Sequence, residues 1–187
     1  MQLPFQLRQS AFDHAIQRLR DGRVGESGYG RRVALVLTIP TYDDPIARDI
    51  RRSASGELYV VRTVWLRSVD LAAVRPSRPE FVAGRVLTVG LDLESNRAPS
   101  LVSSHVPVDV DALNALLESV SSATVTCHCR QPDPPLDATI YEVTFGDELN
   151  ETRYRWTEEP PDGWSALGAF TQRLLHLINE SAGVAQR

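Results

Sequence analysis

The apolar residues of this 187-residue chain are divided into short runs, and this division limits what the chain can fold into. The longest run, Val33 to Ile39, has the length of a buried β-strand and is rich in apolar, β-branched side chains. A membrane-spanning helix needs about 20 apolar residues. We therefore predict one core built from several short strands and helices, with no segment that spans a membrane.

Strand patterns bounded by turn residues recur along the chain. In the last two, Val143 and Phe145 alternate with polar residues, as do Tyr154 and Trp156. Such alternation predicts a hairpin with one apolar face and one face of ion pairs. The predicted strands cover residues 33–39, 58–66, 82–93, 101–106, 124–129, 139–145 and 152–156.

Helical spacing of apolar residues predicts three helices, each preceded by a residue that can cap a helix N-terminus. The caps are Ser10, Asp109 and Asp162. The first two helices cover residues 11–21 and 110–120. The third carries an apolar stripe formed by Trp164, Leu167, Phe170, Leu174 and Ile178. A short helical turn is also predicted, from Asp44-Pro45 to Arg52.

The order helix, strands, helix, strands, helix predicts an α+β fold. We expect a mostly antiparallel sheet with about three helices packed on one face. The length suits a single domain over residues 1–187. A strand, loop, strand and Asp-capped helix occur at Val86 to Val120 and again at Ile140 to Ile178. Two related halves, 1–121 and 122–187, are therefore an alternative to chance alternation.

The C-terminal part has a distinctive order of features. A hairpin segment from Tyr141 to Trp156 is followed by Pro160-Pro161, then Trp164, then a leucine-rich helix. In this order it resembles the C-terminal portion of various uncharacterised bacterial proteins. The resemblance implies no activity. It implies that the proline pair forms a stiff corner, which returns Trp164 to the apolar face of the hairpin.

All 20 basic residues are arginines, and the chain has no lysine. Schiff-base chemistry and a P-loop lysine are therefore excluded. Such arginine usage is typical of a GC-rich bacterial genome. The first residues do not resemble a secretory leader, so we expect a cytoplasmic bacterial protein.

Cys127-His128-Cys129 is the first place to look for a metal site. In a strand the two cysteines point to one face and His128 to the other, so the three side chains do not converge on one ion. We expect two small buried thiols here and no metal site.

Ser165 and Ser103 are the candidates for a catalytic nucleophile. Ser165 lies at the start of a predicted helix and lacks the glycine spacing of a nucleophile elbow. Ser103 shares a strand face with His105, but no acidic residue is identifiable to orient that histidine. We predict no catalytic residue and no cofactor.

Arginines of the N-terminal half are the best candidates for binding a partner or an anion. Residues 1–97 carry 15 arginines against 11 acidic residues, whereas residues 98–187 carry five against 13. Clustered cations suit nucleic acid, but acidic residues lie among them and the pI is about 5.6. The candidate residues are Arg23, Arg31, Arg32, Arg48, Arg51 and Arg52.

Three functions are compatible with these patterns. The leading hypothesis is a non-catalytic protein-binding or regulatory module, such as an adaptor or an immunity-like partner that blocks another protein. The second is a nucleic-acid or phosphate-binding protein that uses the arginines above. The third is an enzyme with a dispersed site, formed by Asp43, Asp44, Arg62, Arg67, His105, Arg153 and Arg155.

Overall fold

The computed structural model of the chain describes residues 3–22, 30–73, 80–82, 85–87, 98–126, 137–147 and 150–184. The helices are α1 (Leu3–Asp21), α2 (Arg67–Ala73), α3 (Val110–Ser121) and α4 (Ser165–Val184). The strands are β1 (Arg31–Ile39), β2 (Ile46–Arg52), β3 (Leu58–Trp65), β4 (Glu80–Val82), β5 (Arg85–Leu87), β6 (Leu101–Val106), β7 (Ile140–Asp147) and β8 (Asn150–Thr157).

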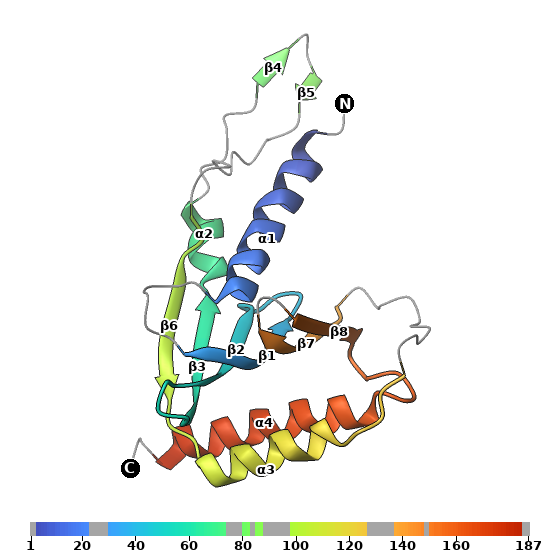
Figure 1. The fold of residues 1–187 in the computed structure, drawn as a ribbon. Coiled ribbons are helices and arrows are strands. Elements are labelled where there is room, and N and C mark those ends of the chain that lie inside the picture. Colours follow the sequence, from blue (N-terminus) through green and yellow to red (C-terminus); the bar gives the residue numbers. More distant parts are fainter. Residues whose placement is uncertain are drawn as a thin grey trace.

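Six of these strands form one antiparallel sheet in the order β6-β3-β2-β1-β7-β8 (Figure 1). The predicted α+β class with an antiparallel sheet is confirmed. Strand β7 pairs with β1, so strands from both predicted halves, residues 1–121 and 122–187, belong to one sheet. Strands β6 and β8 are the two edges.

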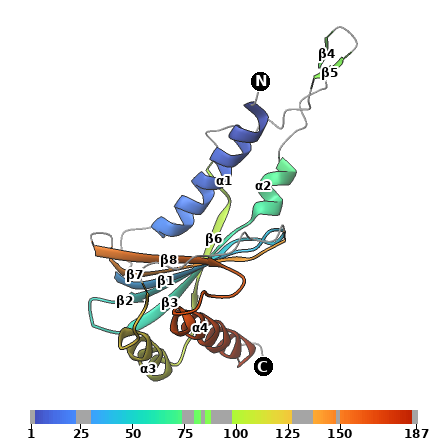
Figure 2. The same cartoon turned by 90° about the vertical axis from the view of Figure 1, so that its right-hand side faces the viewer.

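The helices lie on both faces of the sheet, which corrects the prediction of about three helices on one face. Figure 2 shows α1 on one side and α3 with α4 on the other. The reason is the central strand β1, which is buried on both faces. Ala34 and Val36 belong to the core under α3 and α4, whereas Leu35 and Leu37 belong to the core under α1. A continuous apolar run therefore signals two covered faces.

The core under α3 and α4 is rich in aromatic rings. Trp156 and Trp164 meet edge to face, with ring centres 6.4 Å apart. The Trp164 indole N–H donates to the carbonyl of Thr126 at 2.6 Å. The main-chain N–H of Trp164 donates to Pro161 O, and Gly163 adopts a left-handed φ of 85° that glycine tolerates best. The proline corner thus brings Trp164 back onto the hairpin.

Two predicted elements agree closely with the structure. The β7–β8 hairpin is present, and its apolar residues face α4. Helix α3 begins after Asp109, whose carboxylate accepts from the N–H groups of Asp111 and Ala112. This is the capping arrangement expected for an acidic residue at that position.

The helical turn predicted up to Arg52 is wrong, because these residues form strand β2. This strand pairs along its length with β1 on one side and with β3 on the other. The Asp44-Pro45 pair is a local signal for a helix start, and it is overridden by two complete ladders of backbone hydrogen bonds. The first helix also begins earlier than predicted, at Leu3.

The strand predicted over residues 82–93 is not in the main sheet among the described residues. Strands β4 and β5 instead form a small hairpin of their own. Residues 124–126 are irregular, and the rest of the strand predicted to Cys129 lies outside the described residues. Strand β6 pairs with β3, so the first half of the suggested repeat does not share the hairpin arrangement of β7 and β8.

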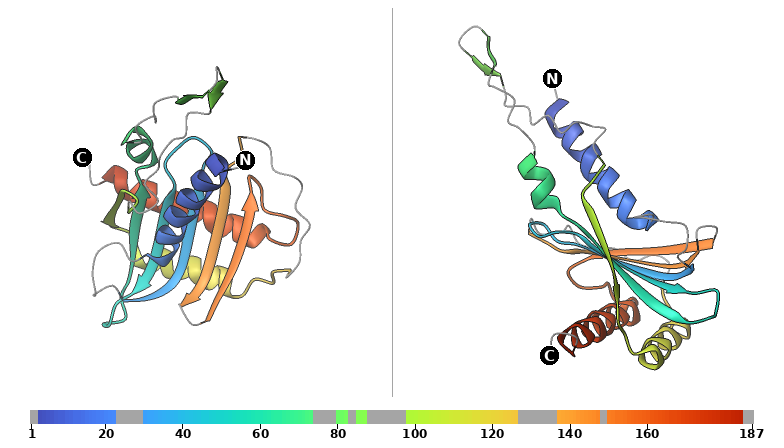
Figure 3. Two further views of the ribbon diagram at one scale, coloured as in Figure 1. Left: turned by 90° about the horizontal axis from the view of Figure 1, so that it is seen from above. Right: turned by 90° about the vertical axis from the view of Figure 1, so that its left-hand side faces the viewer.

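The segment between β3 and β6 is an insertion within the run of antiparallel strands. We call its described elements, α2, β4 and β5, the arm. In all three ribbon figures the β4–β5 hairpin lies away from the sheet (Figure 3). Among the described helices of the chain, none combines the length and the hydropathy that a membrane crossing requires.

Replacing Trp156 tests the aromatic core. Its side chain is 2% exposed, so Trp156→Ala is expected to lower the free energy of unfolding by about 3–5 kcal/mol through lost burial and a residual cavity. Tyr42→Ala is the control, because Tyr42 is 77% exposed, and it is expected to cost about 0.5 kcal/mol or less. Chemical denaturation measures both, and equal losses would contradict the assignment of Trp156 to the core.

Candidate functional site

The predicted arginine cluster is divided by the sheet. Arg31 and Arg52 face one another at the ends of β1 and β2, and both are exposed. Arg32 and Arg51 are also paired across these strands. Arg48 lies near the middle of β2, and Arg23 lies outside the described residues. The six arginines therefore do not form one basic surface.

Arg32 and Arg51 both bind Asp49 on the α1 side of the sheet. Arg32 donates to the two carboxylate oxygens at 3.0 and 3.1 Å, and Arg51 approaches the second oxygen at 2.7 Å. Asp49 and Arg32 are both buried. Asp49 therefore compensates the charge of these two arginines within the protein.

A bulge explains why Arg32 points toward Asp49. The register between β1 and β2 shifts between Arg32 and Ala34, so one residue of β1 has no partner. Ala34 faces the core under α3 and α4, and strict alternation would place Arg32 on that same side. The bulge turns it to the side of α1 instead.

The polar face of the β7–β8 hairpin centres on Glu142. Arg20 of α1 donates to both Glu142 oxygens at 2.8 and 2.7 Å, and Arg153 lies 3.5 Å away. The predicted face of ion pairs is therefore confirmed, and it also binds α1. A polar hollow of about 310 Å³ adjoins it and contains the buried hydroxyl of Thr144, which has no partner in the described part of the chain.

Arg48 and Arg62 form a different kind of pair on the side of α3 and α4. They lie directly opposite one another on β2 and β3. Within the described residues, neither is ion-paired to a carboxylate. Burial, followed by the nearby charge of Arg62, lowers the pKa of Arg48 to about 10, although Tyr141 partly opposes this. Arg62 was named only for the dispersed enzyme site, and its position beside Arg48 depends on strand register.

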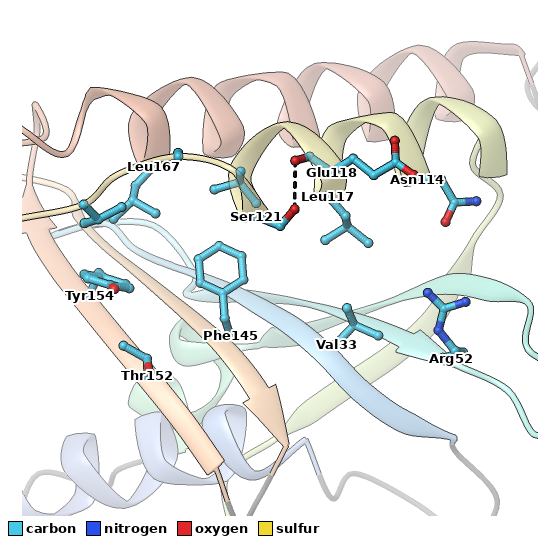
Figure 4. Close-up of a pocket in the computed structure, with 13 residues that line it drawn as sticks. Val33, Arg52, Asn114, Leu117, Glu118, Ser121, Phe145, Thr152, Tyr154 and Leu167 are labelled. Atoms are coloured by element: carbon cyan, nitrogen blue, oxygen red, sulfur yellow. Dashed lines mark hydrogen bonds between the residues drawn. The ribbon is translucent and has the colours of Figure 1, made fainter.

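A groove of about 640 Å³, lined by apolar and polar side chains, runs between α3 and the sheet (Figure 4). Its lining includes the half-buried side chains of Leu117, Phe145 and Tyr154. Polar side chains of Arg52, Asn114 and Glu118 lie toward one end in Figure 4. The groove has the size of a ligand pocket, and its described lining residues include no nucleophile paired with a base.

The two edges of the sheet differ in character. Edge β8 carries Glu151, Arg153 and Arg155 among its eight residues. Edge β6, with the sequence Leu-Val-Ser-Ser-His-Val, has no Asp, Glu, Lys or Arg and no proline. Charges and prolines are the usual protection of an edge strand against pairing with another chain. By this criterion β8 is protected and β6 is open.

The arm is anchored at the start of β6. Asp70 of α2 accepts a hydrogen bond from the Ser100 N–H at 2.9 Å and another from the Trp65 indole N–H at 2.7 Å. The Leu66 N–H donates to the Ser100 carbonyl at 2.9 Å. These contacts join the two ends of the insertion. Val69 of α2 and Val102 of β6 are 51% and 52% exposed.

The residues of the dispersed enzyme hypothesis are not brought together. His105 lies on edge β6 with its ring 5.4 Å from that of Tyr59, whereas Arg153 and Arg155 lie on the opposite edge. Arg67 donates to the Thr41 carbonyl, and Asp44 accepts from the Ser68 N–H. The convergent pocket that this hypothesis requires is therefore not formed by these side chains.

The remaining chemical candidates are Ser103, Ser165 and the Cys127-His128-Cys129 segment. Ser103 shares a hydrogen bond with Thr63 at 2.8 Å, and Ser165 is the first residue of α4. Residues 127–129 lie outside the described residues. In the described ranges, no three His, Cys, Asp or Glu side chains are grouped closely enough to hold a metal ion.

Comparison with known proteins finds no matching family, no matching curated protein and no matching solved structure. The resemblance of the C-terminal part to uncharacterised bacterial proteins therefore stays a prediction. Function has to be argued from the residues of this chain alone.

Neutralising Glu142 tests the polar cluster under α1. Glu142 is 1% exposed, so Glu142→Gln leaves a partly buried Arg20 without its counterion and is expected to cost about 3 kcal/mol or more. Glu151→Gln is the matched control, because Glu151 is 37% exposed and pairs with the exposed Arg153. The control is expected to cost about 1 kcal/mol or less in the same denaturation experiment. Similar losses for both variants would contradict a structural role specific to Glu142.

Removing one charge of the Arg48–Arg62 pair tests whether the two cations repel. Like charges directly opposite on neighbouring strands destabilise a sheet, so Arg62→Gln is expected to raise the free energy of unfolding by about 0.2–1 kcal/mol. Arg173→Gln removes the same charge from an exposed site on α4 and is expected to change it less. Calorimetry at low salt measures both, and a destabilised Arg62→Gln variant would contradict net repulsion.

Proposed function

We propose that the protein is a non-catalytic protein-binding module that binds an extended segment of another protein along edge strand β6. The observation that carries this proposal is the contrast between the open edge β6 and the charged edge β8. Strand addition uses main-chain hydrogen bonds for affinity and alternate side chains for specificity. An uncharged edge of six residues supplies both requirements.

An exposed apolar side chain on β6 supports the proposal. Val102 is half-exposed and pairs with Val64 of β3. The hydrogen bond between Leu66 and Ser100 joins the residue before α2 to the residue before β6. An added strand that meets Val102 would continue toward α2 at the end of β6 where the arm begins. The expected partner segment is therefore extended and places an apolar side chain opposite Val102.

The arm favours a different protein as the partner over a second copy of this chain. A two-stranded hairpin alone is marginal in water, and the β4–β5 hairpin lies apart from the sheet (Figure 1). Its strands include the apolar residues Phe81, Val82, Val86 and Leu87. A partner that covers both β6 and the arm stabilises this hairpin, whereas pairing of two β6 strands alone leaves it without support.

The same proposal places the module in a bacterial cytoplasmic system. The use of arginine for all 20 Lys and Arg positions supports a bacterial origin. An adaptor, or an immunity-like protein that blocks its partner, is the kind of component that such a module suits.

Site-specific photo-crosslinking in the source cells tests strand addition. A benzophenone amino acid is placed at Val102 or Ser104 on β6, and at Thr152 on β8 as the control, since all three positions are exposed. We expect one adduct with a second protein from both β6 positions and none from Thr152. The adduct from Ser104 should fall at least about tenfold when Val102→Lys places a charge on the edge.

The captured protein is then purified and mixed with this chain for hydrogen exchange. Binding is expected to slow exchange of β6 amides and of β4–β5 amides, and to leave β8 unchanged. An adduct without protection of β6, or equal adducts from β6 and β8, would overturn the proposal. An adduct formed by two copies of this chain would also overturn it, because the edge would then serve self-association.

A further inference from the structure

A single row of side chains crosses the sheet on the side of α3 and α4. In order of strand pairing it contains Tyr154, Val143, Val36, Arg48, Arg62 and Ser104. Val143 and Val36 are fully buried in the core. The next two residues in the row, Arg48 on β2 and Arg62 on β3, are basic. Two guanidinium groups therefore lie at the border of the core.

Among the described residues, the Arg48 guanidinium has a buried donor without an acceptor. Each guanidinium carries five N–H groups and no acceptor. Arg48 donates from Nη1 to the Thr38 hydroxyl at 3.0 Å. Its Nε is buried and has no partner within the described residues. A buried donor without an acceptor is costly, and none of the described residues accepts from this one.

Charge in this pair is also uncompensated. Every other buried arginine pair discussed above includes a carboxylate, Asp49 or Glu142. Arg48 and Arg62 have none in the described part of the chain, and they lie opposite one another at about 5 Å between Cβ atoms. Burial and the charge of Arg62 hold the pKa of Arg48 at about 10, below its ordinary value. The cation therefore destabilises the folded protein at neutral pH, and this loss is relieved only as the pH rises through about 10.

We propose that Arg48 and Arg62 together bind a phosphate group, either as the free ion or as part of a small phosphate ester. Two cations match the charge of about −1.5 to −2 that a phosphate group carries at neutral pH. Both guanidinium groups can donate bidentately to its oxygens. The hydroxyl of Thr38 orients Arg48, and Ser104 is the neighbour of Arg62 on β6. This site does not depend on strand addition at β6.

A small hollow provides a place for the rest of an ester. It has about 180 Å³ of space and is lined in part by Tyr141 and Trp156. Tyr141 pairs with Thr38 across β7 and β1, and the Thr38 hydroxyl accepts from Arg48, so the hollow lies on the same side of the sheet as the arginine pair. The Thr171 hydroxyl, buried and without a partner in the described residues, also lines this hollow. An aromatic phosphate ester is therefore the probe that distinguishes an ester from the free ion.

Thermal unfolding in phosphate tests the proposal. The full chain is titrated with inorganic phosphate, and separately with phenyl phosphate, against sodium chloride at equal ionic strength and pH. We expect the melting temperature of the wild type to rise by about 3 °C or more once the ligand exceeds its dissociation constant about tenfold. The rise should be absent in Arg48→Gln and Arg62→Gln and retained in Arg173→Gln. Titration calorimetry should give one site per chain.

The comparison of the two probes identifies the source of the phosphate group. Tighter binding of phenyl phosphate assigns the site to an ester, and equal or tighter binding of inorganic phosphate assigns it to the free ion. A wild type that gains nothing from either probe would overturn the proposal. So would equal gains in the wild type, Arg48→Gln and Arg62→Gln, since that result identifies a general salt effect. Arg62→Gln keeps the test valid if Arg48→Gln does not fold.

Discussion

Burial of strand β1 on both faces is the constraint on which the rest of the structure depends. Its backbone pairs with β2 on one side and with β7 on the other, and its side chains enter both cores. The N-terminal strands and the C-terminal hairpin meet only through this strand in the described sheet. Because the centre is fully enclosed, surfaces that can meet other molecules are left at the sheet edges, in the arm and at the borders of the helices.

Arginines that stabilise the fold are paired with a buried carboxylate, and this distinguishes them from the pair that we assign to ligand binding. Taking a guanidinium out of water costs several kcal/mol unless a carboxylate and hydrogen bonds replace the lost water. Arg32 and Arg20 meet this condition through Asp49 and Glu142, and these contacts hold α1 and the strands together. In the described part of the chain, Arg48 and Arg62 do not meet it. The same physical rule thus explains why one set of arginines is part of the fold and the other is open to an anion.

Local patterns were sufficient for much of the fold and for little of the site. The hairpin of β7 and β8 follows from alternation over eight residues, and the start of α3 follows from Asp109, since both signals act between near neighbours. The strand β2 and the covering of both sheet faces depend on partners distant in sequence. The placement of the predicted arginines also depends on partners distant in sequence. A bulge at Val33 turns Arg32 toward Asp49, and strand register places Arg48 beside Arg62. No local sequence pattern predicts the bulge or this register.

The difference between the two edges has a physical basis in these same contacts. On β8, Arg153 pairs with Glu142 and Glu151, so the charges that protect this edge also support the polar cluster under α1. On β6, Ser103 bonds to Thr63 and His105 lies against Tyr59, while Val102 and Ser104 stay exposed. An uncharged edge is a hazard for aggregation, and replacing one exposed residue by arginine would remove that hazard without disturbing a core. Strand β6 has no such charged residue, and it lies beside an anchored, projecting arm. For this reason we interpret β6 as a surface kept for pairing.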